Sequence, residues 1–156
     1  MLRILFVCTG NTCRSPMAEA LLKEKIRQRG LGDKIMVYSA GVAAGVQAPA
    51  SSGAYLAMHA KGIDLASHVS RQLLPETIAG ADLVLTMTAG HKSSVLQLVP
   101  SAGDKLYTLA EFAGKSGQVA DPFGGSTGIY QACAGQIEQL LELAWDKFVR
   151  LAGKKV

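Results

Sequence analysis

The stretch Cys8–Ser15 (CTGNTCRS) constrains the fold more than any other part of the chain. It follows the apolar run Leu2–Val7, which only Arg3 interrupts, and it precedes a helix-like segment at Met17–Gln28. This order predicts a buried strand, a tight loop and the N-terminus of a helix. In such a turn the backbone N–H groups of the loop point inward and the helix end adds about half a positive charge, so the loop suits an oxyanion.

The residue types in this loop favour attack on a tetrahedral anion. Cys8 stands at the mouth of the loop, and the guanidinium of Arg14 can hold two oxygens of a phosphate at once. A thiol at a helix N-terminus beside arginine becomes a thiolate far more readily than a free one, because its pKa falls from about 8.5 to roughly 3.5–7.5. Gly10 permits a turn that a side chain would hinder, and Asn11 tolerates left-handed backbone geometry. We interpret the loop as a phosphoryl-transfer site.

Several parts of the loop allow more than one interpretation. Ser15 either donates its hydroxyl hydrogen to the thiolate or caps the helix, with Pro16 at the first helical position. Cys13 is either a small buried residue or a second thiol that traps Cys8 as a reversible disulfide and protects it from irreversible oxidation. The whole loop could also be a simple anion-binding turn, with Cys8 as a small core residue.

Length and charge limit the class of protein. A chain of 156 residues is expected to form one domain with a sizeable core. Its formal charge of +4 comes from 16 basic and 12 acidic residues that are mostly scattered. Without a basic stripe or an aromatic platform, nucleic-acid binding is not expected. A mildly basic surface favours a phosphorylated protein as substrate over a cationic one.

The three cysteines are an odd number, which argues against a secreted disulfide framework. The apolar run near the N-terminus is too short for a signal peptide, and no stretch approaches the roughly 18 apolar residues of a membrane span. We therefore expect a cytoplasmic protein without a membrane partner.

Alternating strand and helix patterns predict an α/β fold with a parallel sheet. Gly-rich residues 113–125 are expected to form a loop before the last helix. The apolar stripe of that helix begins at Ile129, ends at Leu151 and includes Cys133, which is therefore expected in the core. His59 and His91 fit the surfaces of their helices. Strands are expected at Leu2–Val7, Ile35–Ser39, Leu83–Met87 and Lys105–Leu109, and helices at Met17–Arg29, Ser51–Lys61, Thr88–Leu98 and from Ile129 to Leu151, with a helical turn at Pro75-Glu76.

Five motifs resemble those of the low-molecular-weight protein-tyrosine phosphatases, in the family's order and over nearly the whole chain. The five motifs are Leu5–Glu19, Ser39-Ala40-Gly41, Ser67–Gln72, Asp82–Met87 and Asp121-Pro122-Phe123. The first and the last of them are highly specific. The resemblance implies a single doubly wound domain over residues 1–156, with four parallel strands in the order 2-1-3-4, helices on both faces and the phosphate-binding loop after the first strand.

The resemblance also implies roles for residues outside the loop. A phosphate ester or phosphoramidate needs its leaving group protonated, and composition alone leaves Asp121, Asp104 and Asp64 as candidates. The family's Asp-Pro motif selects Asp121. In the implied mechanism Cys8 attacks phosphorus, Arg14 and the loop amides hold the oxygens, and no metal or cofactor takes part. The implied substrate-binding residues are Thr9, Gly10, Asn11, Thr12, Cys13 and Phe123, and the implied supporting residues are Ser15, Ser39 and His68, of which His68 would bond Asn11.

Thr12 points to one branch of this family. Tyrosine phosphatases of the family commonly have isoleucine at this position, whereas the bacterial protein-arginine phosphatases have threonine and a segment like Asp121–Gly125. A threonine hydroxyl can accept a hydrogen bond from a phosphoarginine guanidinium. Phe123 is expected either to line the pocket or to pack in the core. Ala43-Ala44 stand where relatives often carry a bulky wall residue, which leaves the pocket more open.

The expected function is therefore a cysteine-dependent protein phosphatase, with phosphoarginine favoured and phosphotyrosine as the alternative. Two other functions remain open. An arsenate reductase would need a resolving thiol beyond the loop, and Cys133 on the core stripe is poorly placed for that role. A non-catalytic phosphate-binding module would not need Cys8, Arg14 and Asp121 together.

Overall fold

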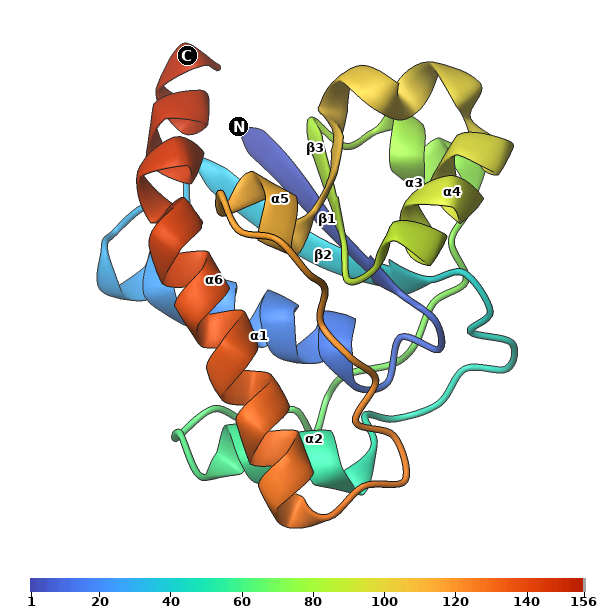
Figure 1. Cartoon of the computed structure of the whole chain (residues 1–156). Helices are drawn as coiled ribbons and strands as arrows, with labels where there is room; N and C mark the ends of the chain where they lie inside the picture. The colour runs from blue at the N-terminus through green and yellow to red at the C-terminus, as the bar shows by residue number, and fades with distance from the viewer. Residues whose placement is uncertain (156) are drawn as a thin grey trace.

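Four parallel strands in the order β2-β1-β3-β4 form the centre of the structure, a computed structural model in which residues 1–155 are described (Figure 1). The order and direction confirm the predicted topology. Because the strands are parallel, their carboxyl ends meet at one edge, where α/β sheets bind ligands. The strands are β1 (Leu2–Cys8), β2 (Ile35–Gly41), β3 (Leu83–Thr86) and β4 (Leu106–Thr108).

Helices cover both faces of the sheet, as predicted (Figure 1). The long helix α6 packs across α1 and α2 on one face. The helices of this face are α1 (Arg14–Gln28), α2 (Ser52–His59), α5 (Leu109–Phe112) and α6 (Thr127–Lys154), and those of the other face are α3 (Pro75–Ala79), α4 (Ala89–Leu98) and the 3₁₀ helix η1 (Pro100–Lys105).

The alternation of side chains along β1 builds a core on each face. Ile4 and Phe6 pack under α1 and α6, whereas Leu5 and Val7 pack under α3 and α4, and all four are fully buried. Burial on both faces explains why the sequence of β1 is an almost continuous apolar run. Cys8 belongs to the first series, so its side chain lies at the carboxyl end of β1 on the α1 side of the sheet.

The first helix begins earlier than the sequence predicts. It starts at Arg14 rather than at Met17, with Cys13 at the N-cap position and no side-chain capping bond. Pro16 is therefore the third helical residue, and the prediction that it occupies the first helical position is wrong. Ser15 does not cap the helix either, because its hydroxyl bonds the Cys8 sulfur and the Asn11 side chain instead.

The structure differs from the sequence prediction in two further places. The short elements η1 and α5 were not predicted. A capping box stabilises α5, in which Thr108 and Glu111 exchange side-chain and backbone hydrogen bonds. Ile129 was predicted on the buried stripe of the last helix but is 52% exposed. The first turn of α6 instead buries Tyr130, which lies directly against Gly53 of α2.

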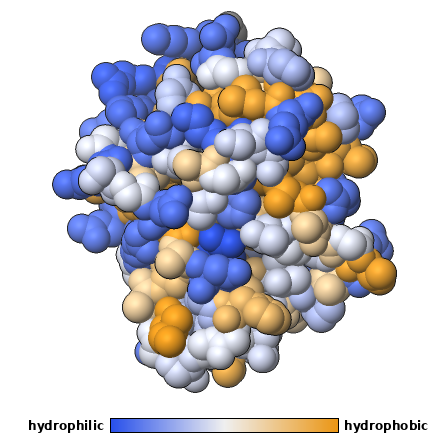
Figure 2. Space-filling view, turned by 45° about the vertical axis from the view of Figure 1, so that its right-hand side comes forward, coloured by the Kyte–Doolittle hydropathy of each residue, from blue (hydrophilic) through white to orange (hydrophobic). Residues whose placement is uncertain are grey.

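Hydrophilic side chains cover much of the left and upper left of the face shown in Figure 2, and apolar side chains gather mainly at its upper right.

Within residues 1–155, none of the helices combines the length and apolar character that crossing a bilayer requires.

Candidate active site

Asn11 holds the loop between β1 and α1. Its φ of 57° lies in the left-handed region, and its side chain is fully buried. Nδ2 donates to the hydroxyls of Ser15 (2.7 Å) and Ser39 (2.9 Å), and Oδ1 accepts from the backbone N–H of Arg71 (3.0 Å). The ring nitrogen Nε2 of His68 lies 2.7 Å from the backbone oxygen of Asn11. These bonds fix the loop conformation, and they bring together the three residues expected to support it.

The directions of these hydrogen bonds follow from the amide. Because Nδ2 of Asn11 only donates, the Ser15 and Ser39 hydroxyls accept from it and keep their own protons for other partners. Ser15 Oγ lies 2.9 Å from Cys8 Sγ, so it can donate to the sulfur. Ser39 Oγ donates to a carboxylate oxygen of Glu19 (2.6 Å). A hydroxyl that donates to sulfur stabilises the thiolate form. The sequence did not predict the contact of Glu19 with Ser39.

Arg14 and Asp121 come together at the carboxyl edge of the sheet. The Arg14 side chain is buried; Nη1 donates to the backbone oxygen of Val119 (3.0 Å), and Nη2 donates to Thr9 Oγ1 (3.3 Å) and lies 3.7 Å from Asp121 Oδ2. The backbone N–H of Val119 donates to the backbone oxygen of Met87, the residue after β3 (3.0 Å), and this bond ties the loop before α6 to the sheet. The Asp121 side chain is 52% exposed, so its carboxyl group faces the mouth of the site.

Three further candidates for substrate binding, Phe123, Thr12 and Thr9, are at least partly accessible. Phe123 is 73% exposed, so the alternative that it packs in the core is wrong. Its backbone N–H donates to Asp121 Oδ1 (3.1 Å), which sets the direction of the carboxyl group. Thr12 is half-buried, and Thr9 is exposed beside Cys8.

Cys13 is buried beneath the loop. Its sulfur lies 3.2 Å from Ser51 Oγ and 3.4 Å from the hydroxyl of Tyr130. Sequence reasoning missed Tyr130, whose ring lies so close to Gly53 that a Cβ there would come within 2.3 Å of it. Burial and the neighbouring Cys13 raise the pKa of Tyr130. The small-residue interpretation of Cys13 agrees with this burial, and a redox role stays a prediction.

His91 is buried, so the prediction that it lies on a helix surface is wrong. Its Nε2 lies 2.9 Å from Thr9 Oγ1, and its Nδ1 accepts from the backbone N–H of Thr88 (3.2 Å). Burial, followed by the nearby Arg14, lowers the pKa of His91 to about 4, although Asp121 opposes this shift. The only sequence signal was its place three residues after Thr88, where a helix start binds a side chain.

This depressed pKa predicts how stability depends on pH. Between about pH 6.5 and pH 4 the unfolded chain protonates His91 and the folded chain does not, so the free energy of unfolding falls as the pH falls through this window. One proton changes the folded-to-unfolded ratio by at most about tenfold per pH unit. Denaturant unfolding between pH 5 and 7 measures the slope, and His91→Asn is expected to reduce it; an equal slope in both proteins would contradict the assignment.

Gly41 at the end of β2 lets the loop pack against the sheet. A Cβ on Gly41 would lie 2.5 Å from the backbone oxygen of Thr9 and 2.9 Å from the backbone nitrogen of Asn11. Real Cβ atoms do not approach backbone this closely, so a side chain here would displace the loop. The Ser39-Ala40-Gly41 motif thus contributes both a hydroxyl and a space to the site.

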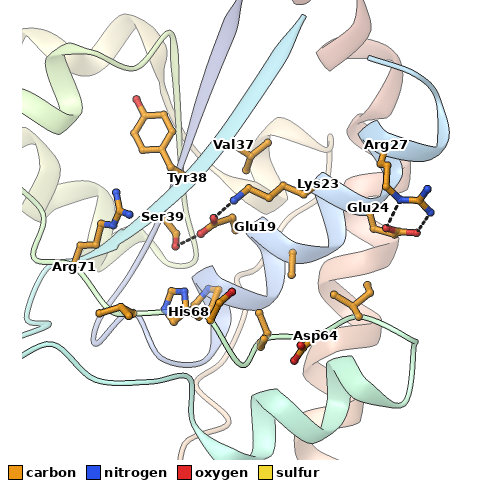
Figure 3. A pocket seen from close by; sticks show the side chains of 16 residues that line it. Glu19, Lys23, Glu24, Arg27, Val37, Tyr38, Ser39, Asp64, His68 and Arg71 are labelled. Carbon is orange, nitrogen blue, oxygen red and sulfur yellow. Dashed lines mark hydrogen bonds and ion pairs between the residues drawn. The ribbon is translucent and has the colours of Figure 1, made fainter. Parts of the chain in front are cut away.

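A cavity of about 570 Å³ lies beside the loop, between α1, β2 and the segment 63–71 (Figure 3). Glu19, Ser39 and His68 line it, and Glu19 pairs with Lys23 on its wall. Cys8, Arg14 and Asp121 do not line it, so the cavity is separate from the mouth of the site. Its wall nevertheless contains side chains that hold Asn11.

Residues 1–155 contain no group of three or more histidine, cysteine or acidic side chains placed to hold a metal ion. The arsenate-reductase alternative would need Cys133 as a resolving thiol. Cys133 is buried, with its sulfur 3.9 Å from the backbone oxygen of Ala120, and burial raises the pKa of its thiol to about 11. A thiol with such a pKa stays protonated and is a poor nucleophile.

Comparison with known proteins identifies similar chains over nearly the whole length. The family described as "Low molecular weight phosphotyrosine protein phosphatase" matches residues 3–151. A protein-arginine-phosphatase of Geobacillus stearothermophilus is 47% identical over 146 residues, which cover 93% of this chain and 95% of that protein. A low molecular weight protein-tyrosine-phosphatase of Streptomyces coelicolor is 35% identical over 145 residues, which cover 87% of each chain.

A solved structure of the YwlE arginine phosphatase is also similar. It is a cysteine-to-serine variant with a phosphorylated active-site serine. It superimposes with a TM-score of 0.86 at 42% identity, covering 98% of this chain and 95% of that one.

Proposed function

The chain belongs to the low molecular weight phosphotyrosine protein phosphatase family, and from that premise we propose that it hydrolyses phosphorylated protein side chains, with phosphoarginine preferred over phosphotyrosine. One observation carries the proposal most directly. The Cys8 sulfur lies 2.9 Å from the Ser15 hydroxyl at the start of α1. Nη2 of Arg14, the residue before Ser15, lies 3.7 Å from Oδ2 of the half-exposed Asp121. This arrangement supports Cys8 as the nucleophile, Arg14 as the cation that binds phosphate and Asp121 as the acid.

In the first step the Cys8 thiolate attacks phosphorus. The S–P bond forms as the bond from phosphorus to the leaving nitrogen or oxygen breaks, and Asp121 gives its proton to the departing atom. The backbone N–H groups of residues 9–13 and the Arg14 guanidinium hold the phosphoryl oxygens. The phosphorylated active-site serine of the YwlE variant supports a covalent intermediate of this kind.

In the second step water hydrolyses the cysteinyl-phosphate. Asp121, now a carboxylate, takes a proton from the water as the new O–P bond forms. The S–P bond breaks, the electron pair returns to Cys8 as a thiolate, and inorganic phosphate leaves. The Ser15 hydroxyl, which Asn11 keeps oriented, donates to the sulfur and stabilises the thiolate as a leaving group. The proposed cycle uses protein side chains and water alone.

Phosphoarginine is favoured on two grounds. The sequence identity to the protein-arginine-phosphatase of Geobacillus stearothermophilus, 47%, is higher than that to the protein-tyrosine-phosphatase of Streptomyces coelicolor, 35%. Thr12 is half-buried in the loop, where its hydroxyl can accept from a guanidinium N–H. An isoleucine at this position would offer an apolar face that suits a tyrosyl ring.

The Thr12→Ile variant tests this preference. We expect the ratio of kcat/KM for phosphoarginine over kcat/KM for phosphotyrosine to fall by about 10- to 200-fold. The guanidinium of phosphoarginine loses its hydrogen-bond acceptor, and the ring of phosphotyrosine gains apolar contact. Turnover of matched phosphoarginine and phosphotyrosine peptides by both proteins measures the ratio. Thr12→Val, which replaces the hydroxyl by a methyl group of similar size, should lose phosphoarginine activity and gain less phosphotyrosine activity than Thr12→Ile. An unchanged ratio in Thr12→Ile would remove Thr12 as the selector.

The proposal extends to partners and organisation. Phosphorylated proteins are the expected partners, and nucleic acid and membranes are not. Residues 1–156 are proposed to act as a single phosphatase domain in the cytoplasm, with no cofactor. The proposal is based on the scattered charge, the odd number of cysteines and the four-stranded sheet that the described residues form.

A further inference from the structure

We propose that His91 is a positioning residue of this site, which holds the Thr9 hydroxyl as a hydrogen-bond donor toward the phosphoryl group bound in the loop. The proposal rests on the proposed function, because it assumes that the loop binds phosphate. It goes beyond that function in assigning a role to a side chain of α4, 82 residues from Thr9 in sequence.

The surroundings of the His91 ring fix its tautomer. The backbone N–H of Thr88 can only donate, and it lies 3.2 Å from Nδ1 of His91. Nδ1 is therefore the unprotonated acceptor, and the proton of the neutral ring is on Nε2. Nε2 lies 2.9 Å from Thr9 Oγ1, so His91 donates and Thr9 accepts.

Thr9 Oγ1 accepts a second hydrogen bond, because Nη2 of Arg14, which also only donates, lies 3.3 Å away. A hydroxyl has two acceptor lone pairs and one proton. With both lone pairs engaged by His91 and Arg14, the O–H bond of Thr9 must point in the remaining direction. Thr9 is exposed next to Cys8, so the natural acceptor for this proton is an oxygen of the anion held by the loop.

The ring is suited to this task because it stays neutral. His91 is only 6% exposed, and the charged groups that face it are Arg14 and Asp121. Burial and Arg14 together hold its pKa well below the physiological range. A protonated ring would set an N–H on Nδ1 against the N–H of Thr88, which would disrupt the start of α4. His91 therefore couples the N-cap of α4 to the phosphate-binding loop.

Two substitutions separate these bonds. The amide of asparagine reaches the place of Nδ1, so His91→Asn keeps an acceptor for Thr88 N–H and loses the donor to Thr9. The longer glutamine places its amide near Nε2, so His91→Gln keeps the donor to Thr9 and loses the acceptor for Thr88. We expect His91→Asn to lower kcat/KM by about 10- to 100-fold, and His91→Gln to stay within about threefold of the wild type.

A second readout measures the loop without turnover. Calorimetric titration with inorganic phosphate should show affinity reduced in His91→Asn and retained in His91→Gln, whereas the melting temperature should fall more in His91→Gln. Thr9→Val should match the loss of His91→Asn, Thr9→Ser should retain activity, and the double variant His91→Asn/Thr9→Val should be no worse than either single variant. His59→Asn, on the exposed surface of α2, is the matched control.

Three results would overturn the proposal: equal losses in His91→Asn and His91→Gln, wild-type phosphate affinity in His91→Asn, or losses that multiply in the double variant. If His91→Asn does not fold, the comparison of Thr9→Val with Thr9→Ser decides in the same way, since only the latter keeps the hydroxyl. If the wild type hydrolyses neither phosphoarginine nor phosphotyrosine, the proposed function fails, and the phosphate affinities still decide the role of His91.

Discussion

Replacing Cys8 by serine is expected to abolish turnover, with kcat reduced by at least about 10⁵-fold. The serine oxygen can still accept from Ser15, and the loop bonds of Asn11 do not involve Cys8, so the fold should survive. What is lost is the anionic nucleophile, because donors and a guanidinium that stabilise a thiolate cannot ionise a serine hydroxyl at neutral pH. Steady-state assays on both phosphopeptides measure the loss, and inorganic phosphate binding shows whether the loop is intact.

The other cysteines provide the control. Cys133→Ser should retain near wild-type activity, because the Cys133 thiol is buried under the loop before α6 and the proposed cycle does not use it. Thiol labelling with mass spectrometry should likewise find Cys8 far more reactive than Cys133. Residual activity above about one per cent of wild type in Cys8→Ser would mean that another group attacks phosphorus.

The sequence predicts the parts of this site that are local. The strand, loop and helix around Cys8–Ser15 follow one another directly, so their order and the glycine and asparagine between them determine the geometry. The stripe of α6 is predicted for the same reason, since a long helix repeats its pattern many times. Strand order and the choice of Asp121 over Asp104 needed the resemblance to a family, because neither follows from local pattern.

The long-range contacts could not be predicted in this way. Thr9 meets His91 across 82 residues, Arg14 meets Val119 across 105, and Cys13 meets Tyr130 across 117. An amphipathic pattern cannot tell a buried histidine that bonds the loop from an exposed one, and His91 looks no different from His59 in sequence. Their difference arises only when α4 packs beside the end of β1.

The start of α1 shows how a local rule fails at a functional site. Ser15-Pro16 has the composition of a helix N-cap followed by a proline at the first helical position. The helix nevertheless begins at Arg14, and no side chain caps it. The Ser15 hydroxyl is committed to Cys8 and Asn11, and the uncapped N–H groups remain available to an anion.

Replacing Asp121 by asparagine should lower kcat for phosphoarginine by about 10²- to 10⁴-fold, the usual contribution of a general acid. The substitution is conservative in shape, because an asparagine oxygen can still accept from the backbone N–H of Phe123. Asn cannot donate the proton that the leaving guanidinium nitrogen needs, so the first step becomes slow. Asp104→Asn, in η1 before β4 and exposed, is the matched control and should leave kcat unchanged.

The leaving group separates a proton-transfer role from a structural one. An aryl phosphate with an acidic phenol needs little protonation, so Asp121→Asn should form the cysteinyl-phosphate from it at nearly the wild-type rate. Hydrolysis of that intermediate still lacks its base, and rapid mixing should therefore show a burst of phenol equal to the enzyme concentration, followed by slow turnover. Phosphoarginine should give no burst. An equal loss for both substrates in the first step would mean that Asp121 only holds Arg14, through the 3.7 Å contact, and that the proton comes from another group.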